Sequence, residues 1–156
     1  MIEISVPGHK KFQFKYLILD YNGTLACDGK LIKGVKGTLA DLSKELELHV
    51  LTADTFGKAR AGLEGIQCKL SILPLDNQDT GKLEYTQRLG AGYTVCIGNG
   101  RNDRLMLAEA ALGIAVIQQE GAAFETLQAA DVVCTGIVSA LNLLLYPLRL
   151  VATLRS

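Results

Sequence analysis

The chain has 156 residues, which is enough for one domain with a substantial hydrophobic core, and we expect a single domain over residues 1–156. Its 16 basic and 16 acidic side chains give a formal net charge of zero, which argues against a general nucleic-acid or anionic-membrane binder. Apolar residues make up 49% of the chain and 16 residues are glycine, a composition typical of an α/β domain with many turns.

The first 15 residues alternate between apolar and polar side chains on either side of a Pro-Gly pair. This pattern predicts a β-hairpin whose second strand continues into the next strand of the chain. The first eight residues contain Glu3 but no long apolar stretch, so we expect a cytoplasmic protein with reduced thiols. The four cysteines lie far apart in the sequence, which makes a zinc site an unfavourable interpretation.

An apolar run over residues 16–19 ends in Asp20, and Gly23 and Thr24 follow at once. A short apolar run bounded by turn residues is typical of a strand that is buried on both faces. Such a strand would place Asp20 at the carboxyl edge of a sheet, where open α/β folds bind their ligands. An aspartate that merely closes a turn at a strand end is the alternative interpretation at this point.

The rest of the chain alternates between strand-like and helix-like stretches. This order predicts a mainly parallel sheet with helices on both faces. Strands are expected at residues 48–52, 68–73, 93–97, 113–117 and 131–134, and helices at residues 37–45, 55–63, 79–90, 102–110 and 122–129.

The final stretch, residues 136–154, is rich in leucine but is interrupted by Asn142, Pro147 and Arg149. We therefore expect no membrane span, and we expect Pro147 to kink or split the helix. Because one helix face cannot bury all of these leucines, we predict a homo-oligomer, either a dimer or a tetramer.

Further along the chain, Thr52 ends a second apolar run, Lys82 lies in a helix-like stretch, and residues 98–103 read Gly-Asn-Gly-Arg-Asn-Asp after another strand. Together with residues 20–24 (Asp-Tyr-Asn-Gly-Thr), these motifs resemble those of the haloacid-dehalogenase-like (HAD) superfamily of phosphohydrolases. Within it, the chain is most similar to the phosphorylation domain of P-type ATPases. The resemblance implies a three-layer α/β/α, Rossmann-like fold around a mainly parallel sheet.

The resemblance also implies residue roles. Asp20 would attack phosphorus to form an aspartyl-phosphate, while Thr52 and Lys82 would stabilise the phosphate charge. The implied cofactor is Mg²⁺, which prefers hard oxygen ligands. The expected catalytic residues are Asp20, Asn22, Thr52 and Lys82, the expected substrate-binding residues are Gly23, Thr24 and Ala53, and the expected metal ligands are Asp20, Asn22, Asn99 and Asp103. Taken singly, Thr52, Lys82 and Asp103 could instead be ordinary helix-end or solvated residues.

Two residues depart from the pattern of the superfamily. Most HAD phosphatases have an acid two positions after the nucleophile, which serves as general acid and base, whereas this chain has Asn22. The later motif usually reads Gly-Asp-Gly, whereas this chain has Asn99 between its glycines. The loss of these two acids predicts slow turnover and weaker Mg²⁺ binding.

The intervals from Asp20 to Thr52 and from Thr52 to Lys82 are too short for the cap domain that many HAD enzymes insert there, so we expect a capless protein with an open site. A slow Mg²⁺-dependent phosphohydrolase or phosphotransferase is the first functional hypothesis. A weakly active or inactive relative that binds a phosphorylated ligand or a protein partner is the second, and a protein devoted to assembly is the third. The expected substrate is a phosphorylated small molecule or a phosphoprotein.

Overall fold

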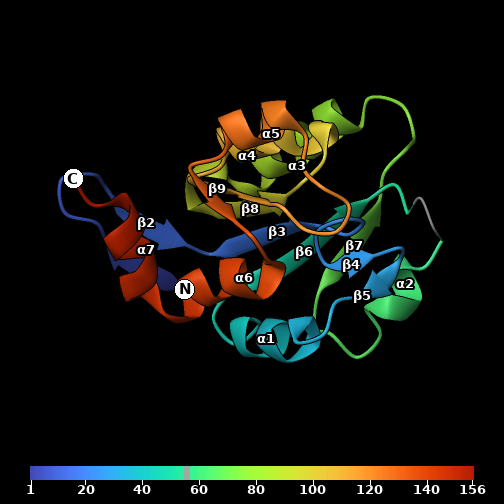
Figure 1. Cartoon of the computed structure of the whole chain (residues 1–156), viewed down its shortest axis with the longest axis horizontal. Helices are drawn as coiled ribbons and strands as arrows, with labels where there is room; N and C mark the ends of the chain where they lie inside the picture. The colour runs from blue at the N-terminus through green and yellow to red at the C-terminus, as the bar shows by residue number, and fades with distance from the viewer. Residues whose placement is uncertain (55–56) are drawn as a thin grey trace.

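A six-stranded parallel sheet forms the centre of the computed structural model, which describes residues 1–54 and 57–156 (Figure 1). Strand β3 lies inside the sheet, between β8 and β6, and pairs in parallel with both. In spatial order the strands are β10 (Val132–Cys134), β9 (Leu112–Val116), β8 (Thr94–Gly98), β3 (Tyr16–Asp20), β6 (Glu47–Thr52) and β7 (Lys69–Ile72). The predicted parallel sheet is therefore confirmed, and the Asp20 strand lies in its interior.

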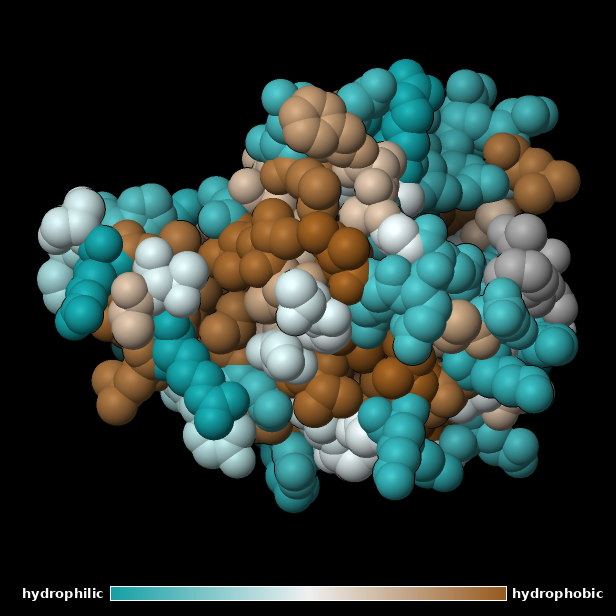
Figure 2. All heavy atoms as spheres, viewed as in Figure 1, coloured by the Kyte–Doolittle hydropathy of each residue, from teal (hydrophilic) through white to brown (hydrophobic). Residues whose placement is uncertain are grey.

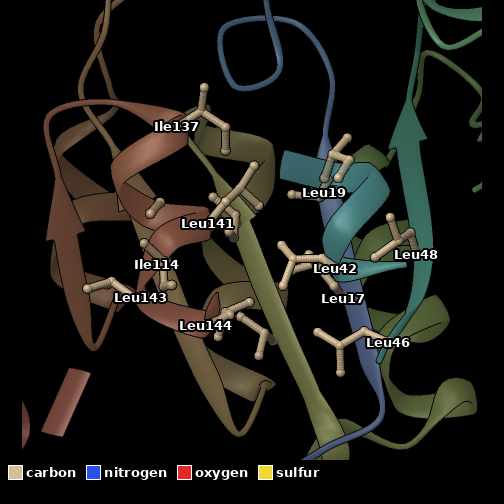
Figure 3. Packing of buried hydrophobic residues seen from close by; sticks show 14 of the residues in the cluster. Leu17, Leu19, Leu42, Leu46, Leu48, Ile114, Ile137, Leu141, Leu143 and Leu144 are labelled. Atoms are coloured by element: carbon tan, nitrogen blue, oxygen red, sulfur yellow. The ribbon is translucent and has the colours of Figure 1, made fainter. Parts of the chain in front are cut away.

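Helices cover both faces of this sheet, which gives the predicted three layers (Figure 1). One face carries α1 (Val35–Leu42) and α6 (Ile137–Leu145), and the other carries α3 (Gln78–Leu89), α4 (Arg104–Glu109) and α5 (Phe124–Ala129). Successive residues of β3 point to opposite faces, so Leu17 and Leu19 pack in the α1/α6 core (Figure 3), while Ile18 joins the core beneath α4. Burial on both faces explains why residues 17–19 of this strand are all apolar.

A β-hairpin of β1 (Ile2–Ser5) and β2 (Lys11–Phe14) projects beyond one end of the sheet, as predicted (Figure 1). Lys15 alone separates β2 from β3. The inner side chains of β2, Phe12 and Phe14, are buried in the α1/α6 core. The hairpin is thus anchored to the domain by apolar packing as well as by the chain itself.

Only short elements fill the two intervals in which a cap could be inserted. Between Asp20 and Thr52 the chain forms β4 (Ala26–Cys27), β5 (Lys30–Leu31), α1 and β6. Between Thr52 and Lys82 the described residues form α2 (Ala59–Gly62), β7 and the start of α3. The described chain therefore matches the expected capless architecture.

Two helix boundaries differ from their predictions. The helix expected at residues 55–63 is reduced to α2, because Gly57 has a left-handed φ of 65° that a continuous helix cannot contain; Thr55 and Phe56 lie outside the described residues. The helix expected at residues 37–45 begins at Val35, because Val35, Leu39 and Leu42 together form its buried face. The other predicted elements are present with boundaries shifted by a few residues.

The leucine-rich end of the chain forms two helices, α6 and α7 (Pro147–Leu154), which meet at Pro147 with a bend of 100°. Pro147 splits the segment as predicted. Among the described residues, none of the helices has by itself the length and hydrophobicity needed to cross a bilayer, although this bent pair reaches both together.

The fold itself buries most of these leucines, whereas Leu148 is 82% exposed. Apolar residues also gather on the surface around α6 (Figure 2). Homo-oligomerisation stays a prediction, and this exposed surface is what supports it.

Candidate active site

Three separate elements bring an aspartate, a lysine and a second aspartate into direct contact at the carboxyl edge of the sheet. Lys82, from the second turn of α3, places its Nζ 2.8 Å from Asp20 Oδ1 and 2.6 Å from Asp103 Oδ1. The side chain of Lys82 is fully buried, which excludes the alternative that it is an ordinary solvated helix lysine. Three charges buried together are costly unless they neutralise one another, so the geometry of each is tightly constrained.

The protonation states of Asp20 and Lys82 follow from this packing. Burial raises the pKa of Asp20 to about 6, with a further increase from Asp103, while Lys82 and the Thr24 hydroxyl act in the opposite direction. Burial disfavours the charged form of Lys82, but the attraction of Asp103 and Asp20 outweighs it and raises the pKa of Lys82 above its usual range. At neutral pH the site therefore contains a carboxylate at Asp20 and a permanent cation at Lys82.

Both carboxylate oxygens of Asp103 accept hydrogen bonds from the protein. Its Oδ1 accepts from Lys82, and its Oδ2 accepts from the backbone N–H groups of Asn99 and Gly100 at 3.0 and 2.9 Å. The close approach requires a glycine at position 98, because a Cβ there would lie 2.4 Å from the Asp103 carboxyl group. In this arrangement Asp103 holds both Lys82 and the loop after β8 in position.

The turn after β3 fixes the backbone beside Asp20. The carbonyl oxygen of Tyr21 accepts from the backbone N–H groups of residues 24–26, at 2.9 to 3.2 Å. Gly23 has a φ of 80°, and a Cβ on it would lie 2.3 Å from Asn99 Nδ2, so only glycine fits this position. The Thr24 hydroxyl lies 3.2 Å from both Asp20 Oδ2 and Asn99 Oδ1 and can donate to either.

Asn99 makes a hydrogen bond that requires the amide N–H of its side chain. Its Nδ2 donates to the carbonyl oxygen of Gly121 at 3.0 Å, and its backbone carbonyl accepts from Ala123. A carboxylate in place of Asn99 would face the Gly121 carbonyl oxygen with no proton between them. Asn99 therefore joins the turn after β3 to the loop after β9, and its role as a metal ligand stays a prediction.

A polar hollow of about 180 Å³ opens directly above Asp20, and we refer to it as the inner hollow. Thr52 Oγ1 accepts from the backbone N–H of Asp54 at 2.9 Å, which leaves its proton for a ligand. Asn22 Oδ1 is buried and has no hydrogen-bond partner among the described residues. The inner hollow is lined by Asp20, Asn22, Thr52, Ala53, Gln78, Asn99, Gly100 and Asn102.

The structure places the predicted site residues in two groups. Asp20, Asn22, Thr52, Ala53 and Asn99 line the inner hollow. The others, Gly23, Thr24, Lys82 and Asp103, lie behind this lining and contact it.

Sequence reasoning missed three further residues. Gln78 and Asn102 line the inner hollow and are hydrogen-bonded to each other at 2.6 Å. Gln78 lies four residues before Lys82 and so shares its helix face, a signal that the sequence did contain. Gln118 donates to the carbonyl oxygens of Gly23 and Thr24 and accepts from the backbone N–H of Ile137, and no sequence pattern marks it.

Comparison by sequence finds two relatives, and both are uncharacterised proteins. No protein-family model matches the chain. Two uncharacterised proteins of Methanocaldococcus jannaschii are similar to it: one is 51% identical over 61 residues, and the other is 49% identical over 39 residues. The first match covers 39% of this chain and 66% of the relative, and the second covers 25% and 89%.

Comparison by structure identifies the fold. A HAD family hydrolase from Streptomyces avermitilis is similar with a TM-score of 0.65 and 21% identity, over 83% of this chain and 81% of that one. This chain has the HAD fold. Other HAD-fold structures are similar to it as well. A 3-deoxy-D-manno-octulosonate 8-phosphate phosphatase from Moraxella catarrhalis, solved with magnesium, phosphate and its sugar, has a TM-score of 0.65 and 21% identity over 85% and 86% of the two chains. A phosphoserine phosphatase in apo form has a TM-score of 0.66 and 13% identity over 86% and 99%.

Proposed function

We propose that this HAD-fold protein is a slow phosphohydrolase or phosphotransferase that acts through an aspartyl-phosphate on Asp20. The observation that carries this proposal is the buried contact of Lys82 with Asp20 and Asp103, directly beneath the inner hollow. A buried, strongly perturbed charge cluster beneath a hollow is expensive to maintain, and such clusters concentrate at functional sites. The phosphatase fold of the similar structures supports the same reaction class.

In the first step, a carboxylate oxygen of Asp20 forms a bond to phosphorus and the bond to the leaving-group oxygen breaks. The pKa of Asp20, about 6, leaves most of its carboxyl groups ionised at neutral pH, so that the nucleophile needs no base. In the second step, water attacks phosphorus, the bond to Asp20 breaks, and phosphate is released. The leaving group takes its proton from water, because the amide protons of Asn22 are not acidic enough to be transferred.

Lys82 and Thr52 supply charge and a hydrogen bond to the phosphoryl group. Lys82 remains cationic across the physiological pH range, because the two carboxylates that hold it raise its pKa. The Thr52 hydroxyl belongs to the lining of the hollow, and within the described residues its proton has no acceptor. Fixed donors of this kind, placed where negative charge develops, stabilise the transition state without reorganising.

The donor set of the inner hollow fits Mg²⁺. Asp20, Asn22 and Asn99 all line it, and oxygen ligands of this type are the ones that Mg²⁺ prefers. The buried Asn22 Oδ1, which lacks a partner among the described residues, is a further oxygen acceptor in this position. A bound Mg²⁺ would neutralise phosphate charge. We assign Asp103 the positioning of Lys82 instead of direct ligation, because its side chain is fully buried and is not part of the lining of the inner hollow.

A second candidate function is the binding of a phosphorylated small molecule or phosphoprotein without turnover. The observation that favours it is the Asn99 amide, which is built into the hydrogen-bonding of the loops through Gly121 and cannot be regarded as a simply missing acid. Combined with Asn22, it leaves the inner hollow with a single carboxylate among its lining residues. Slow catalysis and binding alone differ in whether Asp20 becomes phosphorylated.

The deciding experiment is a search for the phosphoenzyme. We expect the wild-type protein to take up one phosphoryl group from acetyl phosphate in Mg²⁺, detected by intact mass and released by hydroxylamine, which cleaves acyl phosphates. Asp20→Asn should take up none, whereas Asp41→Asn, an exposed aspartate on α1, should behave as wild type. Hydrolysis of p-nitrophenyl phosphate by the same three proteins provides the steady-state rate. Absence of labelling and turnover in the wild type would leave the binding function.

A further inference from the structure

A second hollow, which we call the outer hollow, adjoins the inner one. It has a volume of about 310 Å³ and shares two lining residues with the inner hollow, Gln78 and Asn102. The hydrogen bond between Asn102 Nδ2 and Gln78 Oε1 therefore lies on the boundary of the two spaces. The remaining lining of the outer hollow is Leu75, Asn77, Asp79, Arg101 and Arg104.

The inner hollow alone is smaller than most small-molecule sites. Such sites usually occupy roughly 300–1,000 Å³, and the inner hollow has about 180 Å³. The two hollows taken together fall within that range. For a substrate whose phosphoryl group contacts Asp20, the outer hollow is the adjacent space, beyond Gln78 and Asn102, in which its other end can bind.

Of the two arginines in the outer hollow, Arg104 is occupied by the protein itself. Its NH2 lies 2.9 Å from Asp79 Oδ2, and its NH1 donates to the backbone carbonyl of Arg101 at 2.9 Å. Its Nε lies 3.6 Å from Glu125 Oε2, and the side chain is only 24% exposed. Arg104 thus fixes the wall of the hollow and has little capacity left for a ligand.

The side chain of Arg101 is held by one contact and is otherwise accessible to a ligand. Its Nε donates to Glu125 Oε2 at 3.0 Å, while the side chain remains 69% exposed. No group within the described residues accepts from its two terminal nitrogens. A guanidinium held through Nε presents those terminal nitrogens as a planar pair of donors, which matches the two oxygens of a carboxylate or phosphate.

From this arrangement we propose that the outer hollow selects substrates whose non-reacting end is anionic, with Arg101 as the residue that recognises it. The proposal rests on the proposed function, since it assigns the inner hollow to the transferred phosphoryl group. The predicted substrate class is a small phosphomonoester with a second negative group, either a carboxylate or another phosphate, on a short polar frame. Glu125 orients Arg101 and also offsets part of its charge, so the preference is moderate in size.

Matched substrate pairs test this proposal. The carboxylate is probed by 3-phosphoglycerate against glycerol 3-phosphate, and the second phosphate by fructose 1,6-bisphosphate against fructose 6-phosphate. We expect wild-type kcat/KM to favour the more anionic member of at least one pair, and Arg101→Gln to reduce that ratio about five-fold, as expected for one exposed ion pair. Arg155→Gln, an exposed arginine near the C-terminal end, should leave the ratio unchanged, and added salt should reduce the preference.

The possible outcomes separate this inference from the proposed function. If the enzyme turns over both members of each pair with a ratio that Arg101→Gln does not change, the inference is overturned and the phosphohydrolase stands. If no compound is turned over, the phosphohydrolase fails, and calorimetric binding of the same pairs to wild type and Arg101→Gln decides the inference. An Arg101-dependent preference in binding supports it, and equal or absent binding of both members overturns it.

Discussion

The two ends of the central sheet each carry a hollow, and the smaller one is the candidate active site. At the amino ends of β6 and β7 lies a hollow of about 420 Å³, which we call the amino-end hollow. Its charged side chains are those of Lys44, Glu45, Glu47 and Lys69. At the carboxyl ends lies the inner hollow of about 180 Å³, which sits above the buried Lys82 and its two aspartates.

The difference between these hollows lies in the solvation of their charges. Lys69 pairs with Glu47 at 2.5 Å, but both side chains are largely exposed, and water can replace either partner. Lys82 pairs with Asp20 and Asp103 where the side chains are at most 9% exposed, so each charge depends on the others. The volume of a hollow therefore indicates function less well than the free-energy cost of burying its charged side chains. Changes in folding stability and in activity measure that cost.

The largest expected effect is on folding stability. Lys82→Met preserves the length of the side chain but leaves two carboxylates buried without their cation, which should cost about 3–5 kcal/mol of unfolding free energy. The matched change at the amino end, Lys69→Met, removes an exposed partner and should alter stability little. Urea unfolding followed by circular dichroism measures both. Equal losses at the two sites would contradict the distinction between the two ends.

The pH dependence of stability tests the same burial through Asp20. Its pKa rises from 3.8 in the free side chain to about 6 in the fold, so the folded state holds this proton more tightly than the unfolded state does. In metal-free protein, the contribution of Asp20 is fully present below pH 3.8 and is lost as the pH rises through about 6. Thermal unfolding in EDTA between about pH 4 and pH 8 should show this loss in wild type relative to Asp20→Asn.

Mg²⁺ should act in the opposite sense, because a cation favours the ionised carboxyl group. Its stabilising effect on the wild type is expected to be larger above pH 6 than below it. A Mg²⁺ effect that is independent of pH, or that persists in Asp20→Asn, would argue against ligation by Asp20.

Asn22→Asp should raise turnover. The new carboxyl group stands where most HAD phosphatases have their general acid and base, and it can protonate the leaving group and activate water. Recovery of even part of the usual acid–base effect corresponds to about ten-fold or more in the rate of p-nitrophenyl phosphate hydrolysis.

The wild type, which lacks this carboxyl group, should accumulate phosphoenzyme and should hydrolyse acyl and aryl phosphates faster than alkyl phosphates. A variant as inactive as Asp20→Asn would count against a latent phosphatase.

Several site residues could be placed from the sequence because they follow directly after predicted strands. Asp20 follows an apolar strand and residues 98–103 follow another, and parallel strands bring their carboxyl ends to one edge. Lys82 lies on a helix, and its convergence with Asp20 and Asp103 was implied by the family resemblance alone. Its complete burial was not readable, because burial depends on how α3 packs against the sheet.

The contacts that assign roles within the site were also beyond the sequence. The engagement of both Asp103 oxygens depends on the path of the loop after Gly98, and the Gln118 bridge joins loops that are far apart in the chain. The short α2 reflects a left-handed Gly57, a conformation that glycine permits but does not require. Each of these features depends on tertiary contacts or on a choice between allowed backbone conformations, neither of which local patterns determine.

Asn99→Asp has the smallest expected effect and tests the interpretation of Asn99 most directly. If Asn99 is only a missing metal ligand, the variant should bind Mg²⁺ more tightly at no structural cost. In the structure, however, its Nδ2 donates to the Gly121 carbonyl oxygen, and a carboxylate would lose that hydrogen bond, at a cost of about 1 kcal/mol. We therefore expect Asn99→Asp to be less stable than wild type in EDTA and to regain stability in Mg²⁺. The measurement is urea unfolding with and without the ion, with Asn142→Asp on α6 as the amide-to-acid control. Tighter Mg²⁺ binding by calorimetry without any loss of stability in EDTA would show that the Gly121 contact contributes nothing to folding.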